Sequence, residues 1–372
     1  MPDVLVVGAG PAGLSAAIAL RGAGAEVFVL EQHPSPPPRV CGAFINPEGA
    51  AHLDTLGVLR PLLDAGAVAV TECRLTWPAG GDVRVPIVRG DRAGLAVPRP
   101  TLERVMADHL VARGGNVRWD SRVHRAYRDR DGWSVEILSG TSRHVLTAPL
   151  LVAADGRFST LSGRPVHKSR TGWFGWNASF VEVDQRPGVL SLHLGRKGYV
   201  GLLTFGNGLT NVCGLTRADG TTPMRWEAVL SAAVRERQAL HDLFRDARRV
   251  APYQGVGPLP FSRAMWRGPG PLLAGDAAAV GDPYMGEGIS RALATGPTLS
   301  AALTLEGQGA SPETVAARYN TMWRQRYRLR LSFGTAARWA FGGPRLAARL
   351  PGAVASHPTL LRVVLSLAHE PR

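Results

Sequence analysis

A glycine-rich turn near the N-terminus, Gly8-Ala9-Gly10-Pro11-Ala12-Gly13, constrains this chain more than any other feature. The apolar run Val4-Leu5-Val6-Val7 before it has the pattern of a buried parallel strand. Residues 12–21 then have apolar positions at helical spacing, and a second strand is expected over residues 26–30, just before Glu31. This order of strand, G-x-G-x-x-G turn, helix and acid predicts a dinucleotide-binding βαβ unit.

Each part of this unit has a physical task. Gly8 allows the tight turn out of the strand, Gly10 lets the backbone approach a pyrophosphate, and Gly13 lets the helix pack closely on the sheet. The helix N-terminus offers free N–H groups and a partial positive charge to the phosphates. Glu31 can accept both hydroxyls of an adenosine ribose, which argues against NADP in this unit. The expected cofactor contacts here are Gly8, Gly10, Pro11, Ala12, Gly13, Glu31 and Gln32.

Length and composition are those of a globular protein. The chain has 372 residues, 45% hydrophobic and 19% charged, enough for one large domain or two joined ones. No apolar run reaches the ~18 residues of a spanning helix, and the N-terminus lacks the basic region of a signal peptide. Three scattered cysteines are too few for a disulfide framework or a zinc site, so we expect no metal and a cytoplasmic location.

The charge balance is strongly basic, with 43 Lys and Arg against 29 Asp and Glu, giving +14. Such a balance is compatible with nucleic acid, an anionic membrane surface or an acidic carrier protein. The basic residues are spread along the chain, without the aromatic interleaving of single-strand binders, so we expect no nucleic-acid partner. Arginines on solvated surfaces are the favoured interpretation, and a carrier protein or weak peripheral membrane contact stays open.

Three later segments carry a resemblance to a known superfamily. They are Val97-Pro98-Arg99-Pro100-Thr101-Leu102-Glu103, Ala153-Ala154-Asp155-Gly156-Arg157-Phe158-Ser159, and Leu272-Leu273-Ala274-Gly275-Asp276-Ala277-Ala278, the last followed by Pro283 and Gly286-Glu287-Gly288-Ile289. Together with the first turn, they resemble the flavin-dependent monooxygenases, geranylgeranyl reductases and flavin halogenases, which share the p-hydroxybenzoate hydroxylase fold and are glutathione reductase type 2 flavoproteins.

The resemblance implies FAD as the cofactor. It places Arg99 near the flavin and phosphate region, Asp276 on the ribityl and pyrophosphate region, and the glycines after Asp276 at a helix beside the isoalloxazine ring. A helix N-terminus at that position would stabilise an anionic reduced flavin. The further cofactor contacts implied are Arg39, Cys41, Gly42, Arg99, Val123, Asp155, Gly275, Asp276, Pro283, Gly286, Glu287, Gly288 and Ile289.

The fold class expected is α/β. It combines a Rossmann-like FAD-binding domain, in which two sheets and one helical layer stack as a three-layer ββα arrangement, with an inserted antiparallel substrate sheet and a helical C-terminus. The predicted segments are 1–72, 99–160 and 266–310 for FAD binding, 73–98 and 161–265 for the substrate sheet, and 311–372 for C-terminal helices.

The segment Arg39-Val40-Cys41-Gly42-Ala43 resembles the reductase branch, in which a similar Cys-Gly stretch lies over the flavin. Cys41 is therefore a candidate catalytic residue, and the alternative is a small buried side chain near the ring. The substrate pocket is predicted to include Phe44, Trp173, Trp176, Tyr199 and Leu203.

Two motifs depart from their families. After Tyr199, the reductase motif Tyr-x-Trp-x-Phe-Pro would continue with Trp and Phe-Pro, but Gly201, Leu203 and Thr204 stand there. The segment Trp173-Phe174-Gly175-Trp176 lacks the spacing and the Ile-Pro of the halogenase motif. Both departures weaken the expectation of reduction or halogenation.

Oxygenation is accordingly the leading hypothesis. No second glycine fingerprint follows residue 31, so we expect flavin reduction by transiently bound NAD(P)H, by a separate flavin reductase or by the substrate itself. The sequence favours a monooxygenase that hydroxylates an apolar aromatic or polyketide-like molecule in secondary metabolism. A C=C reductase comes next, and a flavin-dependent halogenase follows.

The C-terminal residues are expected to be helical. Tyr319, Trp323, Tyr327 and Leu331 recur at helical spacing, and Pro344, Pro351 and Pro358 would break the remainder into short helices. The amphipathic, basic stretch of residues 346–367 is predicted to pack as a lid on the substrate domain, with a membrane or carrier contact as the alternative.

Overall fold

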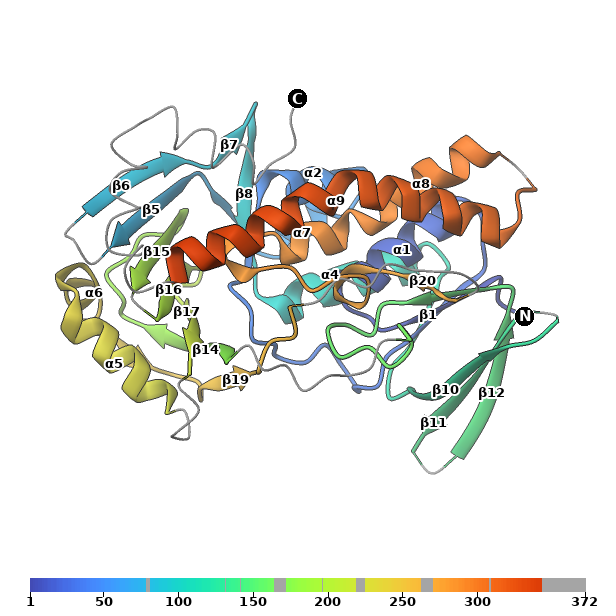
Figure 1. Ribbon diagram of the computed structural model, residues 1–372, viewed down its shortest axis with the longest axis horizontal. Helices are drawn as coiled ribbons and strands as arrows, with labels where there is room; N and C mark the ends of the chain where they lie inside the picture. The colour runs from blue at the N-terminus through green and yellow to red at the C-terminus, as the bar shows by residue number, and fades with distance from the viewer. Residues whose placement is uncertain are drawn as a thin grey trace.

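The structure is a computed structural model that describes residues 1–77, 81–130, 132–140, 142–163, 172–195, 197–218, 225–261, 270–307 and 309–342. Figure 1 shows two halves side by side. One half is built on a parallel sheet with strand β1, the other on a larger sheet with strands β14 to β17, and a long C-terminal helix crosses from one half to the other.

A five-stranded parallel sheet forms the centre of the first half, in the order β20-β13-β1-β2-β9. All four neighbouring pairs run parallel, which suits short apolar strands that are covered on both faces. The strands are β1 (Val4–Val7), β2 (Val27–Leu30), β9 (Asn116–Arg118), β13 (Leu150–Ala153) and β20 (Leu272–Leu273). Segments far apart in the sequence therefore meet in one sheet.

The two faces of this sheet are covered differently, and β1 shows how. Val4 and Val6 pack in the main core with three helices, whereas Leu5 and Val7 pack against a second, antiparallel sheet. Side chains alternate between faces along a strand, so one apolar run serves both layers. The helices are α1 (Pro11–Gly22), α4 (Arg99–Ala112) and α8 (Thr295–Glu306), and the second sheet is β10 (Arg122–Arg128), β11 (Trp133–Ser139) and β12 (Ser142–Ala148). The predicted three-layer fold class is confirmed.

The second half is an eight-stranded mixed sheet. Its order is β18-β14-β17-β16-β15-β5-β6, with β19 also paired to β14. Neighbours run antiparallel except β15 and β5, which are parallel. Its strands are β5 (Glu72–Trp77), β6 (Gly81–Pro86), β14 (Trp173–Val181), β15 (Val189–Gly195), β16 (Gly198–Thr204), β17 (Thr210–Arg217), β18 (Arg248–Arg249) and β19 (Gln254–Val256).

One face of the eight-stranded sheet is covered by two helices, α5 (Trp226–Glu236) and α6 (Gln238–Leu243). Leu230 and Leu240 of these helices share a core with Val200, Leu202 and Val212 of the sheet. The opposite face points to the first half of the molecule. The sheet therefore forms one wall of the space between the halves.

Smaller elements connect the halves. They are β3 (Phe44–Ile45), α2 (Pro47–Thr55), α3 (Leu59–Asp64), β4 (Val68–Val70), β7 (Val88–Arg89), β8 (Arg92–Ala96), the 3-10 turns η1 (Gly275–Ala277) and η2 (Pro283–Met285), and α7 (Gly288–Leu293).

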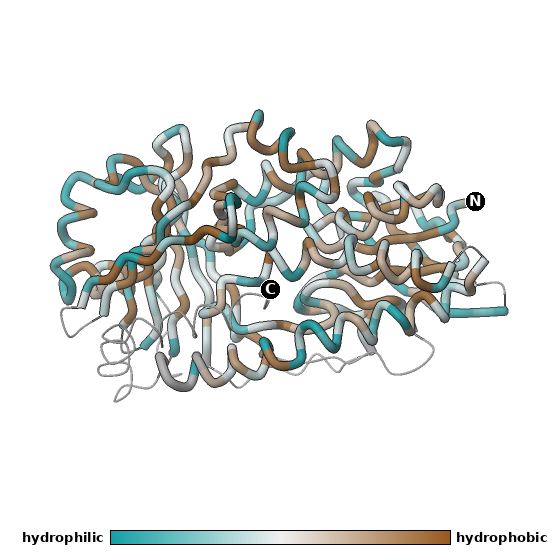
Figure 2. The backbone as a smooth tube through the Cα atoms, turned by 90° about the horizontal axis from the view of Figure 1, so that it is seen from above, coloured by the Kyte–Doolittle hydropathy of each residue, from teal (hydrophilic) through white to brown (hydrophobic). Residues whose placement is uncertain are grey.

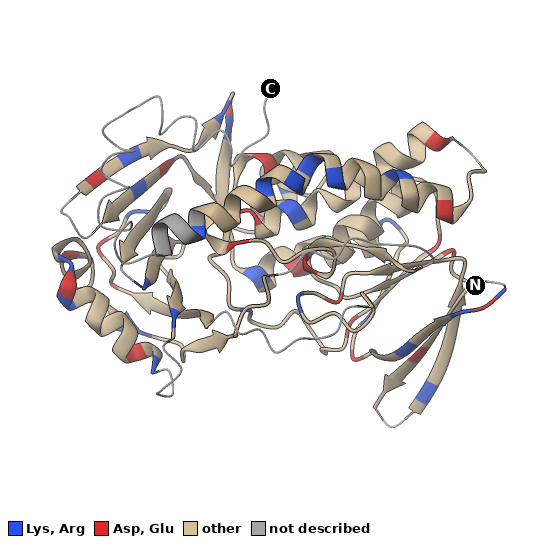
Figure 3. Ribbon diagram, viewed as in Figure 1, with Lys and Arg blue, Asp and Glu red and all other residues tan. Residues whose placement is uncertain are grey.

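The C-terminal helix α9 (Pro312–Gly342) begins beside α8 and ends near the eight-stranded sheet. Tyr319, Trp323 and Tyr327 are buried in the main core, as their spacing predicts. Figure 3 shows several basic residues along the same helix. The expected short helices at Pro344, Pro351 and Pro358, and the amphipathic stretch of residues 346–367, lie outside the described residues.

Hydropathy follows this layering. Figure 2 shows hydrophobic stretches along the central strands and helices. Among the described residues, no helix combines the length and the apolar character needed to cross a bilayer.

Candidate functional site

One pocket of about 1510 Å³ extends between the two halves of the molecule. The first glycine turn, the ends of β2 and β13, the segment after β20 and the open face of the eight-stranded sheet all contribute to its wall. Parallel strands present their carboxyl ends at one edge of a sheet, where open α/β folds bind ligands. The pocket occupies that edge.

The glycine turn is shaped for close approach. Gly8 has a φ of +103°, and a Cβ on it would lie 2.5 Å from the backbone oxygen of Ala154. A Cβ on Gly13 would lie 1.9 Å from the backbone oxygen of Gly8, so this glycine serves helix packing and does not line the pocket. A Cβ on Gly10 would meet no atom within 4 Å and would point into free space. That free space suits a diphosphate.

Glu31 is held against this turn. Its side chain is 4% exposed, and its two carboxylate oxygens accept hydrogen bonds from the backbone N–H groups of Ala9 (2.9 Å) and His33 (3.1 Å). Glu31 also lines the pocket, and its carboxylate has lone pairs left to accept further hydrogen bonds. Gln32 and Val123 line the same pocket.

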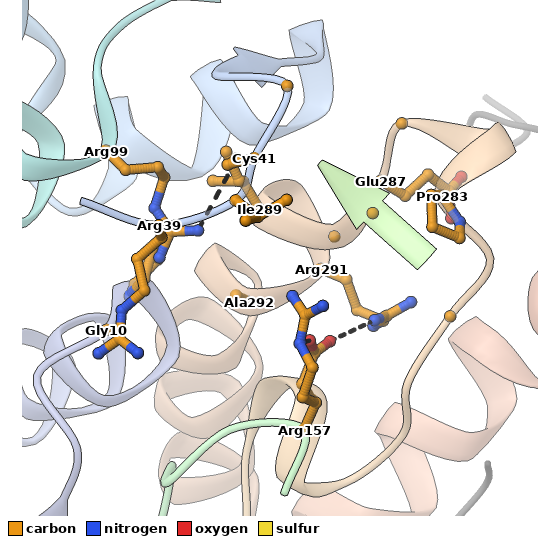
Figure 4. A pocket seen from close by; sticks show the side chains of 18 of the residues that line it. Gly10, Arg39, Cys41, Arg99, Arg157, Pro283, Glu287, Ile289, Arg291 and Ala292 are labelled. Atoms are coloured by element: carbon orange, nitrogen blue, oxygen red, sulfur yellow. Dashed lines mark hydrogen bonds and ion pairs between the residues drawn. The ribbon is translucent and has the colours of Figure 1, made fainter. Parts of the chain in front are cut away.

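Asp276 lies where β20 ends, close to the glycine turn. Its Oδ1 accepts a hydrogen bond from Arg291 Nη2 at 3.0 Å, and its Oδ2 lies 3.7 Å from Arg157 Nε. Figure 4 shows the side chains of Arg157 and Arg291 close to each other in the pocket. Arg291 is 4% exposed, lines the pocket and also donates to the backbone oxygen of Ala279 at 3.1 Å. The two arginines make this part of the pocket suitable for an anionic group.

Sequence reasoning missed Arg157 and Arg291. Arg157 follows the Asp-Gly pair directly, and Arg291 lies in the first turn of α7 after Gly288. Basic residues next to glycine-rich turns are a usable signal for anion binding. Asp155, which we did predict, lines the pocket but also accepts hydrogen bonds from the N–H groups of Thr160 (3.0 Å) and Leu161 (3.4 Å). Its carboxylate thus orders its own loop.

Cys41 and Arg99 meet in the middle of the pocket wall. The Cys41 thiol accepts from the N–H group of Ala43 (3.3 Å) and lies 3.9 Å from Arg99 Nη1, the contact drawn in Figure 4. Burial would lower the pKa of Arg99, but Cys41 and Glu103 raise it, so the guanidinium stays charged. Arg39 and Gly42 line the pocket beside them.

The segment after Asp276 completes this wall. Gly286 has a φ of +61°, in the left-handed region, which glycine adopts without strain. A Cβ on Gly288 would meet no atom within 4 Å, so the start of α7 is open to the pocket. Pro283, Gly286, Glu287, Gly288 and Ile289, the residues expected beside the ring, all line the pocket.

The sheet side of the pocket is apolar. Leu75, Leu190, Leu192 and Leu215 line it from neighbouring strands, together with Phe44 from β3. Two groups here stay protonated at neutral pH: burial raises the pKa of Tyr199 well above its ordinary value and raises that of Cys213 to about 12. The Tyr199 hydroxyl donates to the backbone oxygen of Pro283 at 3.5 Å.

Two residues predicted for the substrate pocket are not among the residues that line this pocket. Leu203 lies at the far end of β16, buried against Ala43 and Val70. Trp173 lies at the start of β14 and packs edge-on against Tyr284, with ring centroids 6.3 Å apart. Both tryptophans are on one strand, but only Trp176 borders the pocket.

Trp176 borders the pocket, but its side chain belongs mainly to the core behind the sheet. It is fully buried and shares the core that the sheet forms with α5, and its indole N–H donates to Thr216 Oγ1 at 3.0 Å. Gly275 likewise faces α1 and not the pocket: a Cβ on it would lie 2.7 Å from Ala12 Cβ. Gly275 thus brings Asp276 next to the glycine turn.

Within the described residues, no cluster of three or more His, Cys, Asp or Glu side chains forms a metal site.

Comparisons with known proteins agree with this geometry. The model of a family described as FAD binding domain matches residues 1–330. The chain is 27% identical to digeranylgeranylglycerophospholipid reductase 2 of Methanopyrus kandleri, over 87% of this chain and 83% of that protein. It is 26% identical to a rifampicin monooxygenase of Streptomyces venezuelae, over 86% of this chain and 67% of that protein.

A solved structure extends the likeness to a third chemistry. The flavin-dependent brominase Bmp2 superposes with a TM-score of 0.80 at 17% identity, covering 99% of this chain and 93% of that one. At this identity the likeness shows the fold alone. Reductases, monooxygenases and halogenases therefore share one architecture with this chain, and the chemistry must be argued from the site.

Proposed function

This chain belongs to the FAD binding domain family and is an FAD-dependent oxidoreductase, and we propose that it is a monooxygenase that hydroxylates an apolar aromatic or polyketide-like molecule. NAD(P)H, bound transiently, or a separate flavin reductase would supply the electrons.

The residues of the pocket fit FAD at four places. The free space at Gly10 and the adjacent α1 N-terminus suit the diphosphate, and the Glu31 carboxylate suits the adenosine ribose. Asp276, held by Arg291, would contact the ribityl and pyrophosphate region. The open backbone at Gly288 would accept the isoalloxazine ring. These groups come from three separate segments, yet they line one pocket.

The observation that carries the proposal is the contrast between the two sides of the pocket. Most of its charged lining side chains, among them Glu31, Arg99, Asp276 and Arg291, lie on the cofactor half, and Arg89 of β7 is a charged lining residue outside that group. The opposite wall, from β15 and β5, presents Leu190, Leu192 and Leu75. An apolar wall binds flat or aliphatic groups by burial, at about 25 cal/mol per Å², and offers a charged substrate nothing.

The chain's own groups act mainly by positioning. The leucine wall excludes water, and Tyr199 and Cys213 stay neutral, so a substrate there meets a dry surface. Bound FAD, once reduced, supplies two electrons, either to O2 for oxygen insertion or directly to a carbon–carbon double bond. We favour oxygen insertion because the apolar wall would keep water away from a reactive oxygen species.

Reduction of a carbon–carbon double bond is the second candidate. It is supported by Cys41, whose thiol lines the pocket beside Arg99, and by the likeness to a reductase over most of the chain. Reduction needs a proton as well as a hydride, and Cys41 or Tyr199 could provide that proton.

Oxygen consumption separates the two candidates. Purified protein with FAD is supplied with NADH or NADPH, or with a flavin reductase, and is presented with alkylphenols and polyenes with and without oxygen. A monooxygenase consumes one O2 for each product formed and makes no product anaerobically. Product formed without O2 favours the reductase, and product that requires bromide or chloride favours halogenation.

A further inference from the structure

Helix α9 packs against the segments that form the wall of the cofactor pocket, and it does so through residues spaced four apart. Arg326, Arg330, Gly334 and Arg338 follow one another along the helix, one turn at a time. Each of them touches either α2 or residues 282–287, the segment that lines the pocket next to Gly288.

Arg330 joins two carboxylates from different elements. Its guanidinium donates to Glu48 of α2 at 2.7 and 3.1 Å and to Glu287 at 2.7 and 3.0 Å. All three side chains are less than a tenth exposed. Arg326 adds a further contact to Glu48 at 2.8 Å, and His52 lies beside them. A buried charge of this kind tolerates little displacement of its partners, because losing one partner leaves the others uncompensated.

Arg338 holds the other end of the segment. Its Nε lies 2.7 Å from Asp282 Oδ2, and its guanidinium covers the ring of Phe261 at 3.8 Å. Asp282 is 3% exposed, and its other carboxylate oxygen accepts from the N–H of Tyr284 at 3.2 Å, which caps η2. Burial raises the pKa of Asp282 to about 6, and Arg338 opposes this rise, so the carboxylate depends on Arg338 for its charge.

Gly334 lies between the two arginines and lets the helix reach the segment. A Cβ on Gly334 would lie 3.1 Å from Asp282 Cβ and 3.2 Å from Met285 Cγ. Phe333, the residue directly before Gly334, lies in the pocket wall itself. The family match ends at residue 330, so Gly334 and Arg338 lie beyond the part of the chain that the family describes.

We propose that Arg338 and Gly334 are positioning residues for FAD: they fix residues 282–287 through Asp282 and Met285, and so set the wall that the flavin ring contacts. The inference rests on the proposed placement of the ring at Gly288 and not on which reaction follows. It makes α9 a part of the cofactor site, although Phe333 is the only one of its described residues in the pocket lining.

The test compares variants of the full chain in FAD binding and in the spectrum of the bound flavin. Arg338→Gln and Gly334→Ala are each expected to weaken FAD binding roughly tenfold and to change the visible circular dichroism of the flavin. Alanine ordinarily stabilises a helix relative to glycine, so a loss in Gly334→Ala would report the crowding of Asp282 and Met285 by the added methyl group and not a weaker helix. Arg338→Lys, which keeps the charge, is expected to recover most of the affinity.

Arg328→Gln is the matched control, because Arg328 is exposed on the same helix and its replacement removes the same charge. It should bind FAD within about twofold of the unmodified chain. Unchanged affinity and spectrum in both Arg338→Gln and Gly334→Ala would overturn the proposal, and so would an equal loss in Arg328→Gln. Thermal unfolding of the apoproteins identifies a variant that loses FAD only because it no longer folds, and such a result in both variants also counts against the proposal. None of these readouts depends on turnover, so they stand apart from the test of the reaction.

Discussion

Gly275 and Ala12 are in contact although they belong to the last and the first segments of the cofactor site. A Cβ on Gly275 would lie 2.7 Å from the Cβ of Ala12, and the glycine has a φ of +58°. The contact brings Asp276 to the mouth of the first glycine turn. This contact is consistent with the expectation that the Gly-Asp segment and the first turn bind the same ligand.

Gly275→Ala should therefore cost both stability and cofactor. The left-handed backbone and the clash with Ala12 together predict a loss of about 1–3 kcal/mol in the free energy of unfolding. Urea denaturation of the apoprotein measures this loss, and flavin content after purification measures the cofactor. Full flavin content with unchanged stability would contradict the contact.

Gly10→Val should abolish FAD binding without unfolding the protein. A side chain there meets no protein atom within 4 Å, so it obstructs only the ligand. The apoprotein should keep its free energy of unfolding within about 0.5 kcal/mol. Gly13→Ala is the contrasting variant, because its Cβ would lie 1.9 Å from the Gly8 oxygen and must disturb the fold itself. A yellow Gly10→Val protein would refute this placement of the diphosphate.

Cys41→Ala should change turnover more than stability. The thiol is only half-buried and accepts weak contacts from Ala43 and Arg99, so its removal should change the free energy of unfolding by less than about 1 kcal/mol. If the thiol faces the ring, the rate of product formation should fall about tenfold or more. Initial rates and thermal melts of the same preparations make the comparison, and equal rates would assign Cys41 to packing alone.

Glu48→Gln should destabilise the protein by about 3 kcal/mol at pH 7, because it leaves Arg330 without one of its two buried carboxylates. Burial alone would raise the pKa of Glu48, but hydrogen bonds from His52, Arg330 and Arg326 outweigh burial and hold this pKa far below its ordinary value of 4.5. The stabilisation from Glu48 is thus complete above about pH 5 and is lost as the pH falls below 4.5.

Urea denaturation at pH 7 and at pH 4 checks both parts of this prediction. The difference between Glu48→Gln and the unmodified chain should be smaller at pH 4. Glu182→Gln, which breaks an exposed pair with Arg248, serves as the control and should change little at either pH. A difference that grows in acid would contradict the assignment of the pKa shift.

The fold could be predicted from the sequence where local pattern decides it. Val4-Leu5-Val6-Val7 and Leu150-Leu151-Val152-Ala153 are apolar without alternation, and such runs become parallel strands covered on both faces. The tyrosine and tryptophan stripe of α9 was likewise predictable, because its spacing of four places it on one helix face.

The rest depends on contacts between distant segments. Trp173 and Leu203 are predicted pocket residues because of the motifs they stand in, but Trp173 packs against Tyr284 and Leu203 packs against Ala43 and Val70, and neither contact can be read from a local motif. Arg330 was only one of several arginines on α9 in the sequence. Its role depends on hydrogen bonds to Glu48 and Glu287, and no local sequence pattern predicts that these residues lie beside it.

The scattered origin of the cofactor site has a consequence for the protein in a living cell. Because FAD would contact the first turn, the segment after β20 and the wall braced by α9, ligand binding and folding are thermodynamically linked. A ligand at a thousand times its dissociation constant adds about 4 kcal/mol to the folded state. The amount of intact enzyme should then follow the riboflavin supply. In cells starved of riboflavin, the amount of the protein should fall before the level of its messenger RNA does.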